Sequence, residues 1–294
     1  MIRTSLYLCL ACTFVIVSLL FVLLILVDHK QREKKESMSN DLVTFPKTIW
    51  TYWNTDNLPE DIQICFDSWK THNPDYTLHI LTSANLSAHV PELAQQLPYF
   101  KHNDSHARAS DFIRLHVLSR YGGFWLDASI LCTSSLRWIQ RRSVGKEFFG
   151  FYLPNFTTDD RYPVIESWCF ACTRGSAFVT SWRDEFMRLN EYETVADYVR
   201  AVSSDTDLQN LATPEYLTIH ASAQRVLQKQ GAATLELVSA TDRTLGPFLY
   251  LNVNQWDSEK AIAQLKSQKH LRTPLIKLRG QERALLQGSD LSSW

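Results

Sequence analysis

The sequence lacks the short motifs by which many proteins hold nucleotide phosphates. Its nine Gly residues form neither a GxGxxG nor a GxxxxGK[ST] pattern, which argues against a dinucleotide-binding fold and against a P-loop protein. The sequence also lacks a large excess of either positive or negative charge. It has 30 Lys and Arg residues and 31 Asp and Glu residues, for a net charge of −1. The chain therefore exerts no broad attraction on a phosphate backbone, and we expect no nucleic-acid partner.

Cysteine is also scarce. The chain has 6 Cys residues, too few for a disulfide scaffold. The segment from Cys169 to Cys172 resembles half of a zinc site, but no second CxxC and no suitably spaced His pair follows it. Positions i and i+3 of a strand point to opposite faces, so we expect these two thiols to be small buried residues of a strand.

One long apolar run is present, near the N-terminus. Residues 5–27 contain no charged residue, and at about 1.5 Å per residue they are long enough to cross a hydrocarbon core of about 30 Å. We therefore predict a tail and transmembrane helix at 1–27, a polar stem at 28–44 and a folded domain at 45–294. A cleaved signal peptide is the alternative, but its apolar region is usually only about 7 to 15 residues long.

The side of the membrane on which the domain lies stays open. Basic residues are denser after the apolar run than before it, which favours a single-pass protein with a cytosol-facing domain. Three glycosylation sequons fit a domain in the lumen of the Golgi or ER instead. They begin at Asn85, Asn103 and Asn155.

After residue 45 the chain alternates β-rich segments with longer amphipathic ones. This order predicts an α/β domain with a mainly parallel central sheet. Ligands of such sheets bind beyond the carboxyl ends of the strands, so Trp53 and Asp127 mark one potential crevice. The predicted strands are 47–53, 76–81, 123–129, 147–152 and 166–172, and the predicted helices are 59–72, 105–121, 176–189, 192–202 and 213–230.

The segment "SDFIRLHVLSRYGGFWLDAS" at 110–129 concentrates charges on a predicted helix. Asp111 and Arg114 share one face of it, and Gly122 or Gly123 can end it in a left-handed conformation. An intrahelical ion pair is one interpretation of the two charges. In the other, Asp111 accepts hydrogen bonds from ligand hydroxyls while the planar fork of Arg114 donates to a phosphate or ring oxygen.

Asp127 follows a run of large apolar residues. A buried strand that ends in an acid needs water, an ion pair or a metal at the carboxylate, although a lone Asp in this position is most often a turn former or helix cap. A hard divalent ion needs about six oxygens, of which a protein supplies only one or two when a diphosphate and waters give the rest. We predict that Asp127 and Ser129 bind Mn²⁺ or Mg²⁺, which would neutralise a leaving nucleotide diphosphate.

Four segments together resemble the capsular polysaccharide synthesis protein family, which is related to the glycosyltransferases with a DXD sugar-binding region. They are "FPKTIWTYW", "CFDSWKTHNPDYTLHIL", "ARASDFIRLHVLSRYGGFWLDASILCTSSL" and "ESWCFACTRGSAFVTSWRDEF". The resemblance implies a GT-A-like fold. It also implies that a divalent metal assists the transfer of a sugar from a nucleotide-sugar donor to a saccharide or glycoconjugate acceptor.

The resemblance also assigns residues to the site. Asp127 matches the first acid of the DXD-type motif, and Ser129 matches the branch of the family that has "DAS" or "DAT" there. The implied catalytic residues are Asp127, Asp111 and Arg114. The implied donor-binding residues are Trp50, Tyr52, Trp53, Asp111, Arg114, Gly122 and Gly123.

The chain departs from its relatives near its C-terminus. Where they often carry "PIHKL", with a His that serves the metal or phosphate, residues 274–278 read "PLIKL" and place Ile276 at the His position. Ser289 and Trp294 are candidates to close the site, although a frayed polar tail is the ordinary interpretation of that segment.

Three matters stay open in the sequence. An inverting transfer would need a base, for which Asp111 and His106 are candidates, whereas a retaining transfer needs none. A membrane-tethered carbohydrate-binding protein that kept the pocket without turnover is the alternative function. A phosphotransferase is disfavoured because no Gly-rich phosphate loop is present.

Overall fold

The computed structural model of the chain describes residues 44–55, 57–267 and 273–286. The predicted membrane span, most of the predicted stem, Ser289 and Trp294 lie outside these residues. Among the helices within them, none is both long and apolar enough to cross a membrane.

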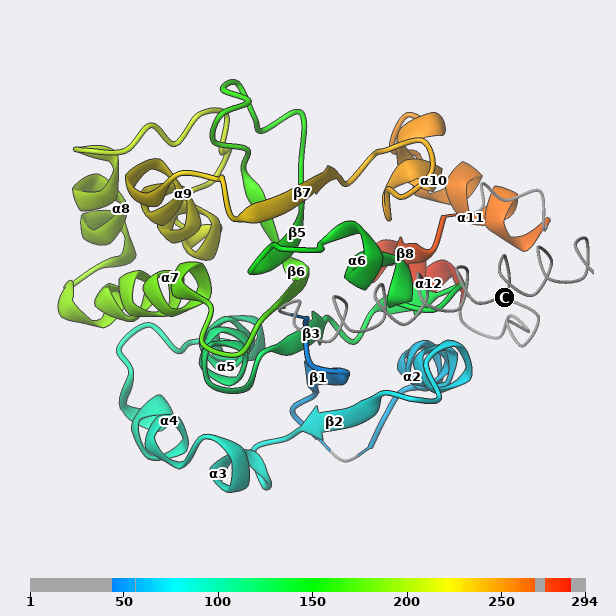
Figure 1. Cartoon of the computed structure of the whole chain (residues 1–294), viewed down its shortest axis with the longest axis horizontal. Helices are drawn as coiled ribbons and strands as arrows, with labels where there is room; N and C mark the ends of the chain where they lie inside the picture. Colours follow the sequence, from blue (N-terminus) through cyan, green and yellow to red (C-terminus); the bar gives the residue numbers. More distant parts are fainter. Residues whose placement is uncertain (1–43, 56, 268–272, 287–294) are drawn as a thin grey trace, which may run out of the picture. The chain divides into compact units, whose positions relative to one another are not determined.

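A six-stranded sheet with the order β2-β1-β3-β6-β5-β7 forms the centre of the described domain (Figure 1). Neighbours β2, β1 and β3 are parallel, as are β5 and β7, and only β6 runs antiparallel to the strands beside it in this sheet. The predicted α/β domain with a mainly parallel sheet is confirmed. The strands are β1 (Thr48–Tyr52), β2 (Thr77–Leu81), β3 (Gly123–Leu126), β5 (Phe148–Tyr152), β6 (Ile165–Cys172) and β7 (Leu235–Ser239).

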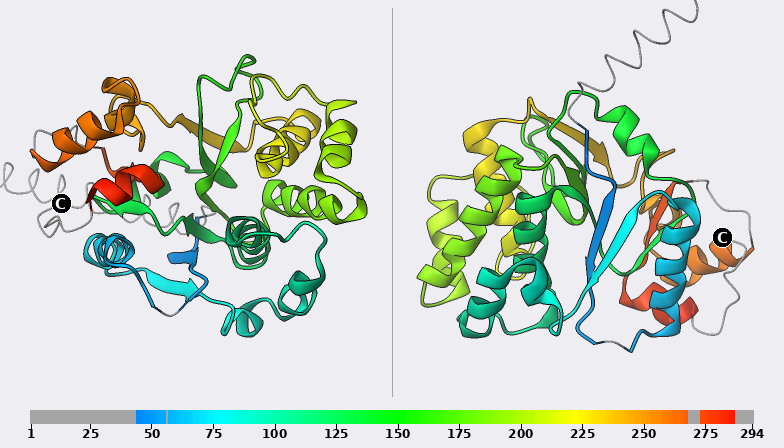
Figure 2. Two further views of the ribbon diagram at one scale, coloured as in Figure 1. Left: turned by 180° about the vertical axis from the view of Figure 1, so that it is seen from behind. Right: turned by 60° about the horizontal axis from the view of Figure 1, so that its bottom comes forward.

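Helices cover both faces of the sheet, and an apolar core lies between the sheet and the helices on each face (Figures 1 and 2). The first core includes residues of α2 (Glu60–His72), α6 (Arg137–Arg142), α10 (Leu249–Val253), α11 (Ser258–Lys266) and α12 (Gly280–Leu286). The second includes residues of α3 (Leu86–His89), α4 (Pro91–Gln96), η1 (Leu97–Tyr99), α5 (His106–Tyr121), α7 (Ala177–Met187), η2 (Arg188–Glu191), α8 (Val195–Ser203) and α9 (Thr218–Gln230).

The two cysteines of β6 lie in different cores. Cys169 packs in the core that contains α2, and Cys172 packs in the core that contains α5. Both thiols are free and buried, and burial raises the pKa of each well above its ordinary value. Their prediction as small core residues on opposite faces of a strand is confirmed.

The glycine pair joins α5 to β3. Gly122 and Gly123 have φ values of +65° and +98°, a region that favours glycine. A Cβ on Gly122 would lie 2.6 Å from the backbone nitrogen of Arg174, and one on Gly123 would lie 2.6 Å from the carbonyl oxygen of Thr48. Close backbone approach therefore explains both glycines. They stand at the start of β3 and Asp127 follows its end, which corrects their assignment to the donor site.

A small second sheet brings a distant segment beside Asp127. In it β4 (Ile130–Cys132) pairs antiparallel with β8 (Leu275–Lys277), and Ile130 stands opposite Lys277. The backbone nitrogen of Leu278 donates to the carbonyl oxygen of Ser129 at 3.0 Å. The side chain of Ile276 is 2 % exposed and packs in the first core.

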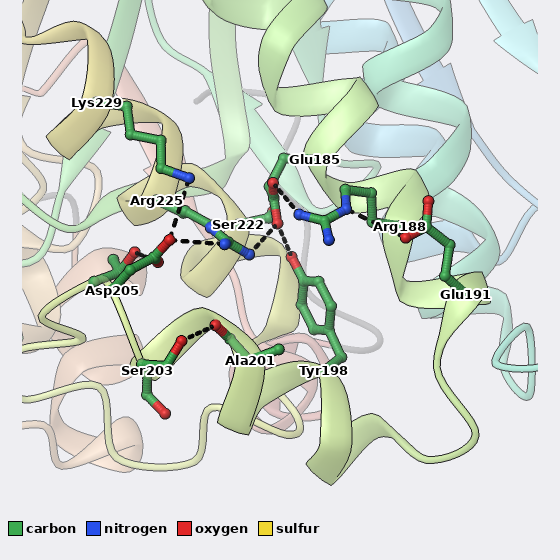
Figure 3. Close-up of polar contacts among 12 residues, drawn as sticks. Glu185, Arg188, Glu191, Tyr198, Ala201, Ser203, Asp205, Ser222, Arg225 and Lys229 are labelled. Atoms are coloured by element: carbon green, nitrogen blue, oxygen red, sulfur yellow. Dashed lines mark hydrogen bonds and ion pairs between the residues drawn. The ribbon is translucent and has the colours of Figure 1, made fainter.

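A network of charges ties α7 and α9 to the chain around α8 (Figure 3). Arg225 of α9 contacts Glu185 of α7 at 3.2 Å and Asp205 at 2.8 Å. Glu185 also pairs with Arg188 at 3.3 Å and accepts a hydrogen bond from the Tyr198 hydroxyl at 3.4 Å. We call Glu185, Asp205 and Arg225 the helical cluster, and its contacts hold helices together.

Candidate active site

A cavity of about 1090 Å³ lies beyond the carboxyl end of β3, where α/β sheets commonly bind ligands. Its walls come from the start of α5, the loop after β5, the start of β6, the segment that leads into α9, and parts of the last third of the chain. The ionisable residues in the lining are Asp104, Arg108, Asp111, Arg114, Asp127, Glu166, Glu215, Tyr216, His220, Lys277 and Arg279. We call Asp111, Arg114, Asp127 and Lys277 the cavity cluster.

Asp127 is fixed by groups on three sides. Its Oδ1 accepts a hydrogen bond from the Trp125 indole at 3.0 Å and lies 3.3 Å from Nη2 of Arg114. Its Oδ2 accepts a hydrogen bond from Nζ of Lys277 at 2.9 Å. Burial by itself would raise the pKa of this carboxyl, but the Lys277 and Arg114 cations outweigh burial and hold the pKa below its ordinary value. Asp127 is therefore a paired carboxylate at neutral pH.

The guanidinium group of Arg114 makes its contacts with other residues of the protein. Nε donates to the Ser110 carbonyl at 3.3 Å, and Nη1 donates to the carbonyl and hydroxyl oxygens of Ser167, both at 2.8 Å. Nη2 donates to the Ser110 hydroxyl at 3.0 Å and lies 3.3 Å from both Asp111 and Asp127. Hydrogen bonds to Ser110 and Ser167 thus use four of its five N–H donors, and the ion pairs of Nη2 face the two carboxylates. Arg114 thus positions two carboxylates, and the geometry does not support its predicted contact with a donor phosphate.

Asp111 lines the cavity on α5. Burial raises the pKa of this carboxyl above its ordinary value, although the nearby cations of Arg114 and Arg108 and the imidazole of His220 oppose the rise. Its contact with Arg114 is the ion pair that the sequence left as one interpretation. Asp111 also presents a carboxyl group to the cavity, which suits hydrogen bonding with ligand hydroxyls.

Lys277 contacts both residues that the sequence predicts as metal ligands. Its Nζ lies 2.9 Å from Oδ2 of Asp127 and 2.8 Å from Oγ of Ser129. A divalent ion on these two oxygens would stand next to the ammonium and be repelled by it. The described residues contain no group of three or more His, Cys, Asp or Glu side chains placed to hold a metal, but the predicted site needs only one or two, so the contact with Lys277 decides the fit. As arranged, these residues do not fit a divalent ion.

Three buried nitrogens of the cavity wall have no hydrogen-bond partner among the described residues. They are Nη1 of Arg108, Nε1 of Trp168 and Nδ1 of His220. Each leaves a polar group unsatisfied, at a cost of about 1 to 3 kcal/mol. Arg108 donates through Nη2 to the carbonyl of Glu215 at 3.3 Å, and Nε2 of His220 lies 3.1 Å from Oε2 of Glu166. Arg108 and Trp168 thus each keep a buried N–H without a partner, while Nδ1 of His220 is an acceptor because Nε2 donates to Glu166.

Trp50 belongs to the protein core rather than to a ligand site. Its side chain is 3 % exposed, and its ring stacks on His79 and Tyr121 with centroids 4.3 and 5.2 Å away. The indole nitrogen donates to the carbonyl of Gly122 at 3.1 Å. Since its ring is buried and stacked on two protein side chains and its nitrogen is engaged, Trp50 cannot stack on a donor base, which corrects its predicted role.

Tyr52 and Trp53 are half-buried and are not among the described residues that line the cavity. The register of β1 with β3 pairs Trp50 with Trp125. Tyr52 is therefore level with Asp127 along two parallel strands and lies at the same edge of the sheet. Contact of these two residues with a nucleotide stays a prediction.

Sequence reasoning missed several residues of the cavity. Lys277 had a signal, because it follows Ile276 in "PLIKL" and successive strand residues point to opposite faces. Burial of Ile276 turns Lys277 toward Asp127. Glu166 and His220 carried no local signal, since only the packing of α9 on β6 brings them together. His106, a candidate base, is not among the described lining residues.

Comparison with known proteins places this α/β chain in a family. The sequence model of the capsular polysaccharide synthesis proteins matches residues 24–202, more than half of the chain. The chain belongs to the capsular polysaccharide synthesis protein family. The matched region contains Asp111, Arg114 and Asp127, and it ends before His220 and Lys277.

Two curated relatives match a shorter region. The O-glycosyltransferase braB of Annulohypoxylon truncatum is 25% identical over 161 residues, which are 50% of this chain and 38% of the relative. The inositol phosphoceramide mannosyltransferase 3 of Schizosaccharomyces pombe is 27% identical over 130 residues, which are 40% of this chain and 36% of the relative. The matched regions thus span less than two fifths of either relative.

Solved structures with a similar arrangement of elements share little sequence with the chain. A glycosyltransferase involved in the glycosylation of the major capsid of PBCV-1 has a TM-score of 0.46 and 9% identity, with 82% of this chain and 98% of that chain covered. The PaToxG glycosyltransferase has a TM-score of 0.43 and 17% identity, with 83% and 84% covered.

Proposed function

We propose that the chain is a glycosyltransferase, which moves a sugar from a nucleotide-sugar donor to a saccharide or glycoconjugate acceptor in polysaccharide or glycan synthesis. The observation that carries the proposal is the cavity beyond β3, where Asp111, Arg114 and Asp127 of the family-matched region meet. The names of both curated relatives, a glycosyltransferase and a mannosyltransferase, support it.

Residues of the chain have distinct tasks in this reaction. Asp111 orients hydroxyl groups of the donor sugar, and Arg114 fixes the positions of Asp111 and Asp127 so that the site is formed before the substrate arrives. Arg108 and Trp168 line the cavity and each keep an unpaired N–H that donates to a substrate oxygen, whereas Nδ1 of His220 accepts from a substrate hydroxyl because Nε2 donates to Glu166. These groups replace water around a polar substrate.

The resemblance to the family implies that Mn²⁺ or Mg²⁺ assists the proposed transfer. When bound, such an ion neutralises charge on a departing diphosphate. The contacts of Lys277 with Asp127 and Ser129 do not favour binding of the ion between these two residues. Metal assistance stays a prediction, and the proposed transfer does not depend on it.

We also propose that residues 5–27 anchor the chain in a membrane as a single-pass protein. Of the three sequon asparagines, Asn85 and Asn155 are exposed and Asn103 is half-buried. Asn155 lines the cavity, where a glycan would obstruct a ligand. The side of the membrane on which the domain lies stays open.

A donor panel tests the function. The full chain in detergent is mixed with UDP- and GDP-linked hexoses, with or without Mn²⁺, and release of free UDP or GDP is measured. We expect slow hydrolysis of at least one donor, since water can replace the acceptor. Binding of UDP or GDP without any hydrolysis or transfer identifies the alternative, a carbohydrate-binding protein without turnover. Absence of both binding and hydrolysis contradicts the proposed function.

A further inference from the structure

The side chain of Lys277 holds the position that the family resemblance gives to a metal. We propose that its ammonium group takes the place of the divalent ion and stabilises the diphosphate of the donor, so that transfer proceeds without a metal. This inference rests on the proposed glycosyltransferase function. It concerns a residue outside the family-matched region, in a strand that pairs with the chain just after Ser129.

Charge balance at the site favours an ammonium over a divalent ion. One carboxylate and one hydroxyl, those of Asp127 and Ser129, face Nζ of Lys277 at 2.9 and 2.8 Å. The same carboxylate also pairs with Arg114 at 3.3 Å, so it faces two cations and leaves no negative charge for a doubly charged ion. A second carboxylate in place of Ser129 would instead favour such an ion. Ser129 and the contact with Lys277 are thus parts of one arrangement.

Lys277 has a donor left for the ligand, whereas the guanidinium of Arg114 is held by Ser110, Ser167 and the two carboxylates. Two contacts, with Asp127 and Ser129, leave a further N–H of the ammonium without a partner among the described residues. The lysine side chain is 11% exposed and lines the cavity. A compact ammonium at the cavity wall is well suited to bind phosphate as a point charge.

The fold holds this lysine in place through its backbone. Its nitrogen donates to the carbonyl of Pro247 at 3.1 Å, and its carbonyl accepts a hydrogen bond from the Tyr250 hydroxyl at 2.7 Å. Pairing of β8 with β4 fixes the register. The positive charge is therefore positioned before the donor binds, which is the condition for effective electrostatic catalysis.

The proposed transfer forms one bond at the anomeric carbon and breaks one. A lone pair of the acceptor oxygen forms the new bond to the anomeric carbon of the donor sugar. The bond between that carbon and the β-phosphate oxygen breaks, and its electron pair leaves with the nucleoside diphosphate. The acceptor proton passes to solvent. The ammonium of Lys277 donates a hydrogen bond to the departing diphosphate and stays protonated throughout.

The test compares metal removal with removal of the ammonium. Hydrolysis of the best donor and binding of the matching nucleoside diphosphate, UDP or GDP, are measured in EDTA and in Mn²⁺ for the wild type, Lys277→Met and Lys277→Arg. Lys47→Met is the matched control, because Lys47 pairs with Asp75 at 2.6 Å outside the cavity lining. Thermal melting checks that each variant is folded.

We expect the wild type to keep its rate in EDTA within about twofold. Lys277→Met should lose about 100-fold or more in kcat, the usual effect of removing one such charge-stabilising donor, and should bind UDP or GDP more weakly. Lys277→Arg should retain part of the activity, and Lys47→Met should behave as the wild type.

Two results overturn the inference while the proposed function stands. One is a wild type that loses activity in EDTA and regains it with Mn²⁺, an outcome that needs no variant to fold. The other is a folded Lys277→Met with unchanged kcat and unchanged nucleotide binding. If the wild type neither binds a nucleoside diphosphate nor hydrolyses a donor, the proposed function and this inference both fail.

Discussion

The cavity cluster and the helical cluster each pair carboxylates with basic side chains, and these side chains are largely buried except that of Asp205, which is 42% exposed. In the helical cluster the side chains of Glu185 and Arg225 are both 11% exposed, and in the cavity cluster those of Arg114 and Lys277 are 6% and 11% exposed. Exposure and pairing therefore do not separate the two. The difference lies in what the charges face.

In the helical cluster, Arg225 contacts the other two members, Glu185 and Asp205 (Figure 3). None of them is among the described residues that line the cavity. The cavity cluster lies in a wall that also contains unpaired nitrogens of Arg108, Trp168 and His220, whereas the helical cluster leaves only Nε of Arg225 unpaired among its described atoms. A position in the wall of a cavity, rather than ion pairing, distinguishes a candidate binding site from a structural network.

The largest expected effect is in the cavity cluster. Asp127→Asn removes the charge that positions Lys277 and Arg114, so donor turnover should fall by about 1,000-fold while the fold is retained. Hydrolysis of the nucleotide sugar and circular dichroism measure the two properties. Asp184→Asn is the matched control, since Asp184 is an exposed residue paired with Arg183. Normal turnover of Asp127→Asn would remove Asp127 from the mechanism.

A change in the helical cluster should act on stability instead. Glu185→Gln removes one partner from a buried pair with Arg225, so the free energy of unfolding should fall by about 3 kcal/mol. Urea unfolding measures it, and kcat of the remaining folded protein should be unchanged. Glu191→Gln is the control, because Glu191 contacts Arg188 from an exposed position. Equal losses in both variants would show that burial of Glu185 adds nothing.

The smallest expected effect is a pH dependence of opposite sign for the two cavity carboxyls. Asp127 has a lowered pKa, so its stabilisation is present above the ordinary Asp value of about 3.9 and is lost as pH falls through the lowered pKa. Asp111 has a raised pKa, so the folded state loses stability as pH rises from about 4 through that raised pKa.

Urea midpoints measured between pH 3 and pH 8 for the wild type, Asp111→Asn and Asp127→Asn test these signs. The midpoint of Asp111→Asn should gain on that of the wild type as pH rises and then level off. The midpoint of Asp127→Asn should approach that of the wild type as pH falls below about 4. A difference that is constant with pH would contradict the shifted pKa of the residue concerned.

The first half of the domain could be predicted well because its signals are local. The helix predicted at 59–72 forms as α2, and the helix predicted at 105–121 forms as α5, where the Ser105 hydroxyl accepts a hydrogen bond from the backbone nitrogen of Arg108 at 3.2 Å. Period and turn residues within a few positions determine such elements. The location of Asp127 after a buried strand follows from the same kind of signal.

The roles of side chains were less predictable because they depend on packing between distant segments. The resemblance assigned Trp50 to the donor-binding site, but its ring stacks on His79 and Tyr121 in the core. The donors of Arg114 are used by Ser110 and Ser167 as well as by the two carboxylates. No pattern in one segment indicates which neighbours another segment will bring.

The pairing of β8 with β4 has a consequence for the order of assembly. Asp127 and Lys277 are 150 residues apart in the chain, and the last strand of the main sheet, β7, ends at Ser239. Closing so long a loop costs entropy that only later contacts recover. During synthesis all strands of the main sheet leave the ribosome before the lysine does. A nascent chain thus makes all strands of its main sheet before it makes the lysine that pairs with Asp127, so the site is completed after the scaffold.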